Sequence, residues 1–157
     1  IFLTTGMIGT DKKRPRYKDM ATSDMLSWEE VREMADNGIT FGAHTVNHPH
    51  LSHLDYEQQK KEIKESIDAV GTKVFCYPYG DYNSDTLRVL KELGVDKAYT
   101  IKPGINNAKV NQLELRRTEI SGVDSLFDFK KKLAGAFDVM HEFIQKKKGI
   151  WFADIER

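Results

Sequence analysis

The chain of 157 residues has few of the features that would assign it to a specialised class of protein. Its single cysteine, Cys76, allows no internal disulfide bond and no cluster of thiolate metal ligands. No apolar run approaches the roughly 20 residues that a membrane-spanning helix needs. Basic and acidic residues are equal in number, 24 of each, so the net charge of zero gives no indication of a nucleic-acid partner.

What remains is an ordinary globular composition, with 39% hydrophobic and 10% aromatic residues. The length fits one domain. Because the opening residues, Ile1 to Thr5, have the character of a core strand already under way, we expect residues 1–157 to form a single domain that is N-terminally incomplete. The basic cluster within residues 12–18 is predicted to be a solvated loop.

Strand-like apolar runs alternate with helix-like periodic segments, which is typical of parallel βαβ construction. After the opening strand, the predicted strands are 39–43, 74–77, 98–101, 115–120 and 150–153, and the predicted helices are 28–37, 55–70, 84–93 and 125–146. Ser27 and Glu30 have the spacing of a capping box, and Ser84 is predicted to cap the third helix. The alternation fits an open doubly wound sheet or an incomplete barrel. In both folds, functional groups gather at the C-terminal edge of the sheet.

Four of the five histidines fall within ten residues, directly after the predicted strand 39–43: His44, His48, His50 and His53. Two histidines four residues apart can bind one transition-metal ion if the backbone between them turns once. Pro49 disfavours a helical conformation at His48, so we expect a strand-end turn in which Thr45 supplies hydrogen bonds. The alternative is a polar surface loop with incidental histidines, which is the favoured interpretation for His50 and His53.

Two histidines alone do not make a catalytic metal site, which usually has three protein ligands and an open position for water. The histidine loop contains no third ligand. A second cluster follows the predicted strand 74–77, where Tyr79 and Tyr82 either line a binding groove or pack as ordinary aromatic residues. Cys76 is expected to be a small buried strand residue.

The motifs resemble those of the polysaccharide deacetylases of the NodB-homology type, carbohydrate esterase family 4. Residues 44–49, HTVNHP, are similar to the His-Ser/Thr-x-x-His-Pro metal motif of that family, and residues 75–83, FCYPYGDYN, are similar to its Pro-Tyr-Gly motif. The resemblance implies an α/β fold, a distorted incomplete (β/α) barrel. It also implies a metal-dependent hydrolase that removes N-acetyl or O-acetyl groups from a polysaccharide, with an acetylated amino-sugar polymer or oligosaccharide as partner.

The same resemblance assigns roles to individual residues. It implies that His44 and His48 bind a divalent metal, in the first place zinc, with nickel or cobalt as alternatives. It implies that the backbone N–H of Tyr79 faces an oxyanion and that Tyr79 and Tyr82 contact substrate. The family's aspartate pair, which supplies the third metal ligand and the base, precedes the strand that Ile1 begins and is absent from this sequence.

The family has an arginine just before its Pro-Tyr pair, and this chain has Cys76 at that position. The substitution resembles a subgroup of the family in which another arginine takes over the role. Arg117 resembles that arginine and is the predicted catalytic cation. Because strand residues alternate faces, Arg116 remains the other candidate, and a surface ion pair of Arg117 with Glu114 or Glu119 is the alternative. The family's general-acid histidine, which lies late in the sequence of its members, has no clear counterpart in this chain. His141 is expected to be structural, since it lies in a helical pattern.

Three functional alternatives therefore stand. The leading one is a metal-dependent deacetylase, the second a non-catalytic relative that binds carbohydrate or metal, and the third a metal-independent amidohydrolase of small molecules. Since polymeric acetylated sugars lie outside the membrane, the resemblance also implies a secreted or cell-envelope location.

Overall fold

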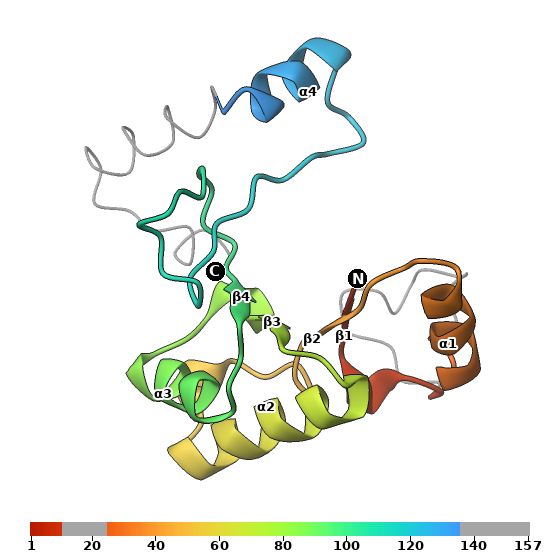
Figure 1. Ribbon diagram of the computed structural model, residues 1–157, viewed down its shortest axis with the longest axis vertical. Coiled ribbons are helices and arrows are strands. Elements are labelled where there is room, and N and C mark those ends of the chain that lie inside the picture. Colours follow the sequence, from red (N-terminus) through yellow and green to blue (C-terminus); the bar gives the residue numbers. More distant parts are fainter. Residues whose placement is uncertain (11–24, 136–157) are drawn as a thin grey trace.

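The computed structural model describes residues 1–10 and 25–135 (Figure 1). The predicted basic loop, His141, the strand 150–153 and the second half of the helix 125–146 lie outside these residues. Four parallel strands form one sheet in the order β1-β2-β3-β4. They are β1 (Phe2–Leu3), β2 (Gly42–Ala43), β3 (Val74–Cys76) and β4 (Lys97–Tyr99). One further parallel bridge joins Tyr99 to Leu115.

Three helices connect successive strands close to the predicted ranges, and a fourth follows the last described strand. They are α1 (Trp28–Asp36), α2 (Tyr56–Val70), α3 (Ser84–Glu92) and α4 (Leu126–Leu133), with short 3-10 turns η1 (Thr5–Met7), η3 (Leu51–His53) and η4 (Pro78–Gly80). The predicted capping box at Ser27 is confirmed. The prediction for Ser84 is wrong: Asn83 caps α3, because its side chain accepts from the Thr86 N–H while the Thr86 side chain accepts from the Asn83 N–H.

The strand order distinguishes between the two folds that periodicity leaves open, the doubly wound sheet and the incomplete barrel. A doubly wound sheet reverses its strand order at a switch point, whereas a barrel adds each new strand on the same side of the last one. The described strands run in one direction from β1 to β4, with a helix between each pair (Figure 1). This part of the chain therefore has the arrangement of a barrel segment.

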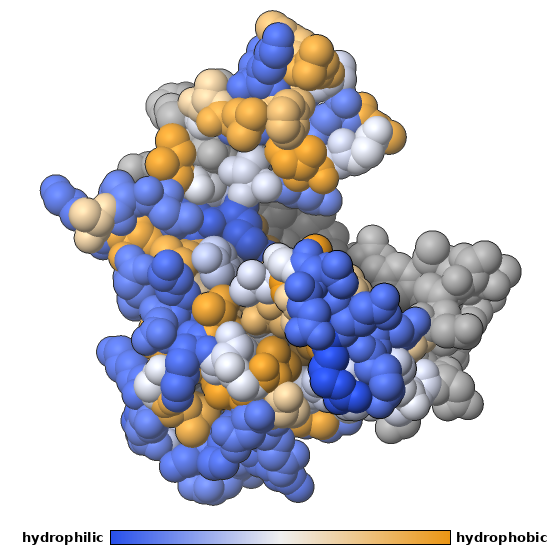
Figure 2. Space-filling model, turned by 45° about the vertical axis from the view of Figure 1, so that its right-hand side comes forward, coloured by the Kyte–Doolittle hydropathy of each residue, from blue (hydrophilic) through white to orange (hydrophobic). Residues whose placement is uncertain are grey.

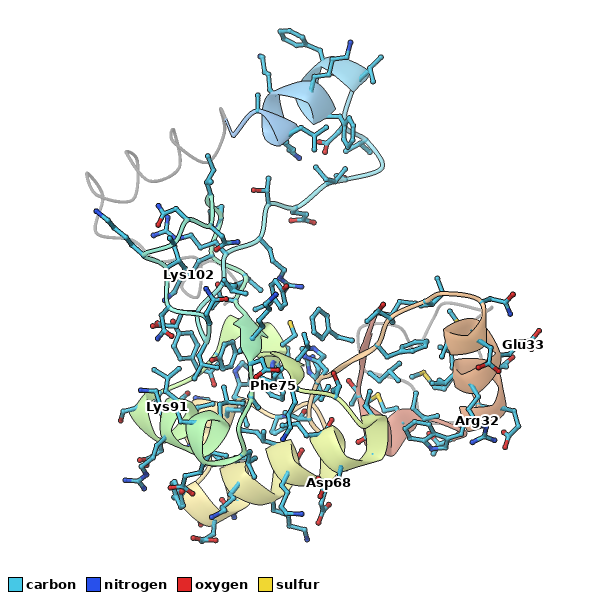
Figure 3. The ribbon with its side chains drawn as sticks, viewed as in Figure 1. Arg32, Glu33, Asp68, Phe75, Lys91 and Lys102 are labelled. Atoms are coloured by element: carbon cyan, nitrogen blue, oxygen red, sulfur yellow. The ribbon has the colours of Figure 1, made fainter. Side chains whose placement is uncertain are left out.

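The main core lies between the sheet and the helices α2 and α3, which run along one side of it (Figure 1). Phe75 of β3 is fully buried in the middle of this layer, against Ile63 and Leu90 of the two helices. Asp68 and Lys91, by contrast, point away from the core into solvent (Figure 3). The alternation of apolar and polar faces on α2 and α3 thus fixes how these helices cover the sheet.

The described strands are all shorter than predicted, and local hydrogen bonds explain two of these cases. Of residues 39–43, only Gly42 and Ala43 pair, because the Ile39 N–H is bound by the Met34 carbonyl at the end of α1. Of residues 115–120, only Leu115 pairs, since the side chain of Asn106 occupies both the N–H and the carbonyl of Arg116. Side-chain and helix-end hydrogen bonds here replace the sheet ladder.

Beyond β4 the chain runs away from the core to α4, which stands apart in Figure 1. α4 begins after the N-cap Ser125 and stops at Leu133, short of the predicted 125–146, because Gly135 adopts a left-handed φ of 72°. Apolar side chains gather on the surface over α4 in Figure 2, among them the exposed Leu126 and Phe127. None of the helices in the described part of the chain combines the length and apolar character needed to cross a membrane.

Candidate functional site

The carboxyl ends of the parallel strands bring together segments that are far apart in the sequence. The turn η1 follows β1, the histidine loop (residues 44–54) follows β2, η4 follows β3, and Thr100 follows β4. Functional groups of parallel α/β folds gather at this edge, because their βα loops converge there. Both predicted motifs therefore lie at one edge of the sheet, as expected.

His44 and His48 face each other across a turn. Their Nε2 atoms lie 3.1 Å apart, and their rings meet edge to face with centroids 4.7 Å apart. The Nδ1 atom of His44 lies 2.6 Å from the carbonyl oxygen of Cys76. Since a carbonyl oxygen only accepts, Nδ1 is the protonated nitrogen and Nε2 of the neutral ring presents its lone pair. The predicted strand-end turn is confirmed.

This arrangement fits two ligands of one divalent ion. Nitrogen ligands about 2.0–2.1 Å from a tetrahedral ion lie about 3.3 Å from each other. Metal-binding histidines usually donate their second ring N–H to a carboxylate, carbonyl or water, as His44 does to Cys76. Within residues 1–10 and 25–135, no group of three or more His, Cys, Asp or Glu side chains is placed to hold a metal. That the two histidines bind one stays a prediction.

Thr45 shapes the turn between the two histidines. Its fully buried hydroxyl donates to the His44 carbonyl at 2.6 Å and accepts from the His48 N–H at 3.0 Å. Pro49 disfavours the right-handed helical conformation at His48, which adopts a φ of 59°. The hydrogen-bonding role predicted for Thr45 is therefore confirmed.

The histidine loop is clamped from two sides. On one side the Gly6 N–H donates to the Val46 carbonyl at 2.9 Å, and a Cβ at Gly6 would come within 2.7 Å of that oxygen. On the other side the carboxylate of Glu62 accepts from the N–H groups of Val46 and Asn47 at 3.0 and 2.9 Å. Glu62 was not found from the sequence, because it lies 16 residues beyond Val46 on α2 and no local pattern links the two.

Backbone strain is concentrated at this site. Three non-glycine residues of the described chain have a positive φ, and all three lie here: Thr45 at 64°, His48 at 59° and Tyr79 at 56°. Each such residue costs about 1–3 kcal/mol and persists only where its surroundings hold it. Strain of this kind clusters at active sites and ligand clamps. It is an indication of function independent of the histidine spacing.

The Pro-Tyr-Gly segment forms η4 and brings Tyr79 beside the histidine pair. The rings of Tyr79 and His48 lie 4.5 Å apart between centroids. A Cβ at Gly80, which has a φ of 68°, would come within 2.4 Å of the Ile101 side chain, so the turn requires glycine there. None of the hydrogen bonds within residues 1–10 and 25–135 uses the Tyr79 N–H, which leaves that donor available to a ligand.

Arg117 reaches the position of Cys76. Its Nε donates to the Thr100 carbonyl at 2.8 Å, and its guanidinium lies 6.0 Å from the centre of the Phe2 ring. Burial raises the pKa of the Cys76 thiol, and Arg117 opposes this shift through its charge and a hydrogen bond. Arg117 is thus the cation beside the cysteine that replaces the family's arginine.

Arg116 lies against Asn106 and Gly104. Its backbone N–H and carbonyl are both bound by the side chain of Asn106, each at 2.9 Å, and its side chain lies against Gly104. Glu114, the suggested ion-pair partner of Arg117, instead accepts from Tyr82 and Asn111. The structure therefore places Arg117 rather than Arg116 beside Cys76, while a catalytic role for Arg117 stays a prediction.

Tyr82 belongs to a polar cluster beside the core. Its ring stacks on the buried ring of Tyr77 with centroids 4.5 Å apart, and its hydroxyl donates to Glu114 at 2.7 Å. The hydroxyl also accepts from the ammonium of Lys102, which is labelled in Figure 3. Burial and the Glu114 contact raise the pKa of Tyr82. Substrate contact by this residue stays a prediction.

Comparison with known proteins gives concordant matches. Residues 1–98 match the family model described as polysaccharide deacetylase. The chain is 29% identical over 110 residues to YxkH of Bacillus subtilis (strain 168), provisionally named a polysaccharide deacetylase, and the match covers 66% of this chain. The solved structure of the Streptococcus pyogenes deacetylase PplD in complex with acetate has a TM-score of 0.66 at 30% identity and covers 74% of this chain.

IcaB from Ammonifex degensii, at 20% identity, has a TM-score of 0.63 and covers 87% of this chain and 60% of its own. The likeness to PplD and IcaB confirms the predicted fold, an α/β arrangement with a parallel sheet of the NodB type. The chain spans 39% of the length of YxkH and 54% of that of PplD.

Proposed function

Because the chain belongs to the polysaccharide deacetylase family, we propose that the protein removes acetyl groups from a polysaccharide. Water would cleave the carbon–nitrogen bond of an N-acetylated sugar to give acetate and a free amine, or an O-acetyl ester to give acetate and a hydroxyl. The observation that carries the proposal is the bond from His44 Nδ1 to the Cys76 carbonyl, which directs Nε2 to within 3.1 Å of His48 Nε2.

His44 and His48 would hold a divalent metal, for which we propose zinc before nickel or cobalt. Imidazole suits all three ions. A bound ion of this kind polarises a carbonyl and lowers the pKa of a water molecule from 15.7 toward about 7. Two histidines need a third ligand, and the reaction needs a base. In the family, an aspartate pair supplies both.

Two further residues would assist the reaction, one by binding the oxyanion and the other by orienting the base. The N–H of Tyr79, next to the histidine pair, is proposed to donate to the oxyanion that forms when water attacks the acetyl carbonyl. Arg117 is proposed to orient the base and keep it ionised, because a cation beside a partly buried carboxylate lowers its pKa. Its position beside Cys76 supports this role. The ring of Tyr79 would contact the sugar.

A second candidate is a non-catalytic relative that binds carbohydrate or metal. It would use the same histidine pair and the exposed ring of Tyr79 without a catalytic base. The two candidates differ in whether acetate is released, so one assay separates them.

The test uses the full-length protein, stripped with a chelator and reloaded with one equivalent of zinc. Incubation with N-acetylglucosamine oligomers should release acetate and expose free amines, and the chelated protein should do neither. A variant with His44→Ala and His48→Ala should be inactive, while Glu65→Ala on the exposed side of α2 should keep full activity. Binding without acetate release would support the second candidate and overturn the first.

We propose a secreted or cell-envelope location, because a polymeric acetylated sugar is found outside the membrane. Immunodetection of the full-length protein in medium, envelope and cytoplasmic fractions tests this. Recovery in the cytoplasmic fraction alone would contradict it.

A further inference from the structure

Three aromatic rings form a stack beside the histidine pair. The rings of His50 and Tyr79 lie 4.1 Å apart between centroids, with their planes 7° from parallel. His53 continues the stack at 5.1 Å from His50, with a tilt of 26°. All three side chains are exposed, and Tyr79 retains 45% of its accessible surface. Tyr79 also meets His48, at 76° between planes. The ring of Tyr79 thus contacts both a proposed metal ligand and His50.

The backbone of Tyr79 requires such support. Its φ of 56° is unfavourable for a residue with a Cβ, so neighbouring contacts must hold it. Pro78, on one side, is buried, and the Gly80 N–H on the other donates to the Tyr77 carbonyl at 3.0 Å. Among the ring pairs of the described residues, His50 and Tyr79 have the shortest separation and the most nearly parallel planes. The stack is therefore the contact best placed to hold the Tyr79 side chain.

His50 is itself anchored. The next residue, Leu51, is fully buried and begins η3. The Ser52 N–H donates to Asp81 Oδ2 at 2.8 Å, and the same oxygen lies 3.9 Å from His50 Nδ1. Asp81 directly follows η4, so the histidine loop and the Tyr79 turn are joined at two points, the ring stack and the Asp81 carboxylate. A ring at position 50 is thereby fixed relative to Tyr79.

We propose that His50 is a positioning residue for Tyr79. Its ring would hold Tyr79 in the left-handed conformation and so fix the direction of the Tyr79 N–H. This inference rests on the proposed function, in which that N–H stabilises the oxyanion. The role requires a flat ring at position 50 and does not require the imidazole nitrogens. His50, which the sequence favours as an incidental surface histidine, thereby becomes part of the support of the site.

Two substitutions at one position test this role in the zinc-loaded full-length protein. His50→Leu removes the flat ring, and His50→Phe keeps it without nitrogen atoms. We expect His50→Leu to lower kcat about threefold to tenfold, the range that corresponds to the loss of one aromatic pair, with KM and zinc content little changed. His50→Phe should restore kcat to within about twofold of the wild type. His53→Leu is the matched control, because its ring contacts His50 rather than Tyr79, and it should change kcat less than about twofold.

A second readout does not depend on activity. The amide and ring-proton chemical shifts of Tyr79 should move in His50→Leu and stay near their wild-type values in His50→Phe. If the wild type releases no acetate, the proposed function fails while these shifts still decide whether the stack holds Tyr79. Equal loss of kcat in both His50 variants, loss of zinc in either, or unchanged Tyr79 shifts in His50→Leu would overturn the proposal.

Discussion

The carboxylate of Glu62 binds Asn47 twice, through the backbone N–H at 2.9 Å and through Nδ2 at 2.7 Å. Asn47 directly precedes His48, so this helix residue fixes the loop that carries both histidines. Loss of a residue that orients a metal ligand typically weakens metal affinity by about 10-fold to 100-fold. The relationship therefore predicts that Glu62 influences the proposed metal site without touching it.

Glu62→Ala should weaken zinc binding about tenfold, since the N–H groups of Val46 and Asn47 would lose their acceptor and the turn would loosen. The free energy of unfolding should fall by about 1–2 kcal/mol. Isothermal titration with zinc and urea denaturation measure the two effects. Glu65→Ala, at an exposed position three residues further along α2, is the control and should change neither. Equal zinc affinity in both variants would contradict the prediction.

Metal content tests the histidine pair directly. We expect the full-length protein to bind one equivalent of zinc and the variant with His44→Ala and His48→Ala to bind none, because their Nε2 atoms are the proposed ligands. His53→Ala should keep the metal, since its ring faces His50 instead. Mass spectrometry of the metal after gel filtration gives the stoichiometry. One equivalent retained by the double variant would show the assignment to be wrong.

Arg117→Lys should lower kcat about tenfold, or roughly 1.4 kcal/mol of transition-state stabilisation, with unchanged zinc content. A planar guanidinium can hold a carboxylate through two parallel hydrogen bonds, and a lysine ammonium cannot. Arg116→Lys is the matched control, because the backbone of Arg116 is bound by Asn106 away from Cys76. Steady-state kinetics of both variants decide the matter: small, equal effects would remove Arg117 from the proposed site.

Tyr82 makes stability depend on pH through Glu114. The hydrogen bond from Tyr82 lowers the pKa of Glu114, assisted by Asn111 and by the charge of Lys102. A carboxyl group with a lowered folded-state pKa stabilises the fold above its unfolded pKa, and that contribution disappears as the pH falls through the folded value. Wild-type stability should therefore drop between about pH 5 and about pH 3.

Tyr82→Phe should reduce this acid-induced loss by up to about 1 kcal/mol, because the stabilising bond is already absent at neutral pH. Urea denaturation at several pH values measures it. The control is Tyr99→Phe on β4, which leaves the Tyr82–Glu114 bond intact. A pH dependence identical to that of the wild type would contradict the assignment of Tyr82 to this cluster.

Local chemistry in the sequence was enough to predict α1, α2 and α3 and the strand-end turn between the two histidines. Capping residues act on backbone groups within one turn, so the Ser27 capping box and the helix predicted over 55–70 follow from neighbouring residues alone. The His44–His48 spacing together with Thr45 and Pro49 likewise specifies a strand-end turn through contacts only a few residues apart. The family resemblance rested on the same short motifs.

The tertiary structure alone decided which distant groups support that site. Glu62 reaches the histidine loop from α2, and Arg117 reaches Cys76 across the end of the sheet, because parallel strands bring their carboxyl ends to one edge. Periodicity gives the face of a residue within its own element but not the register between elements. It therefore could not decide whether Arg116 or Arg117 faces the site. The strain at Tyr79 and its stack on His50 arise only when β2 and β3 lie side by side.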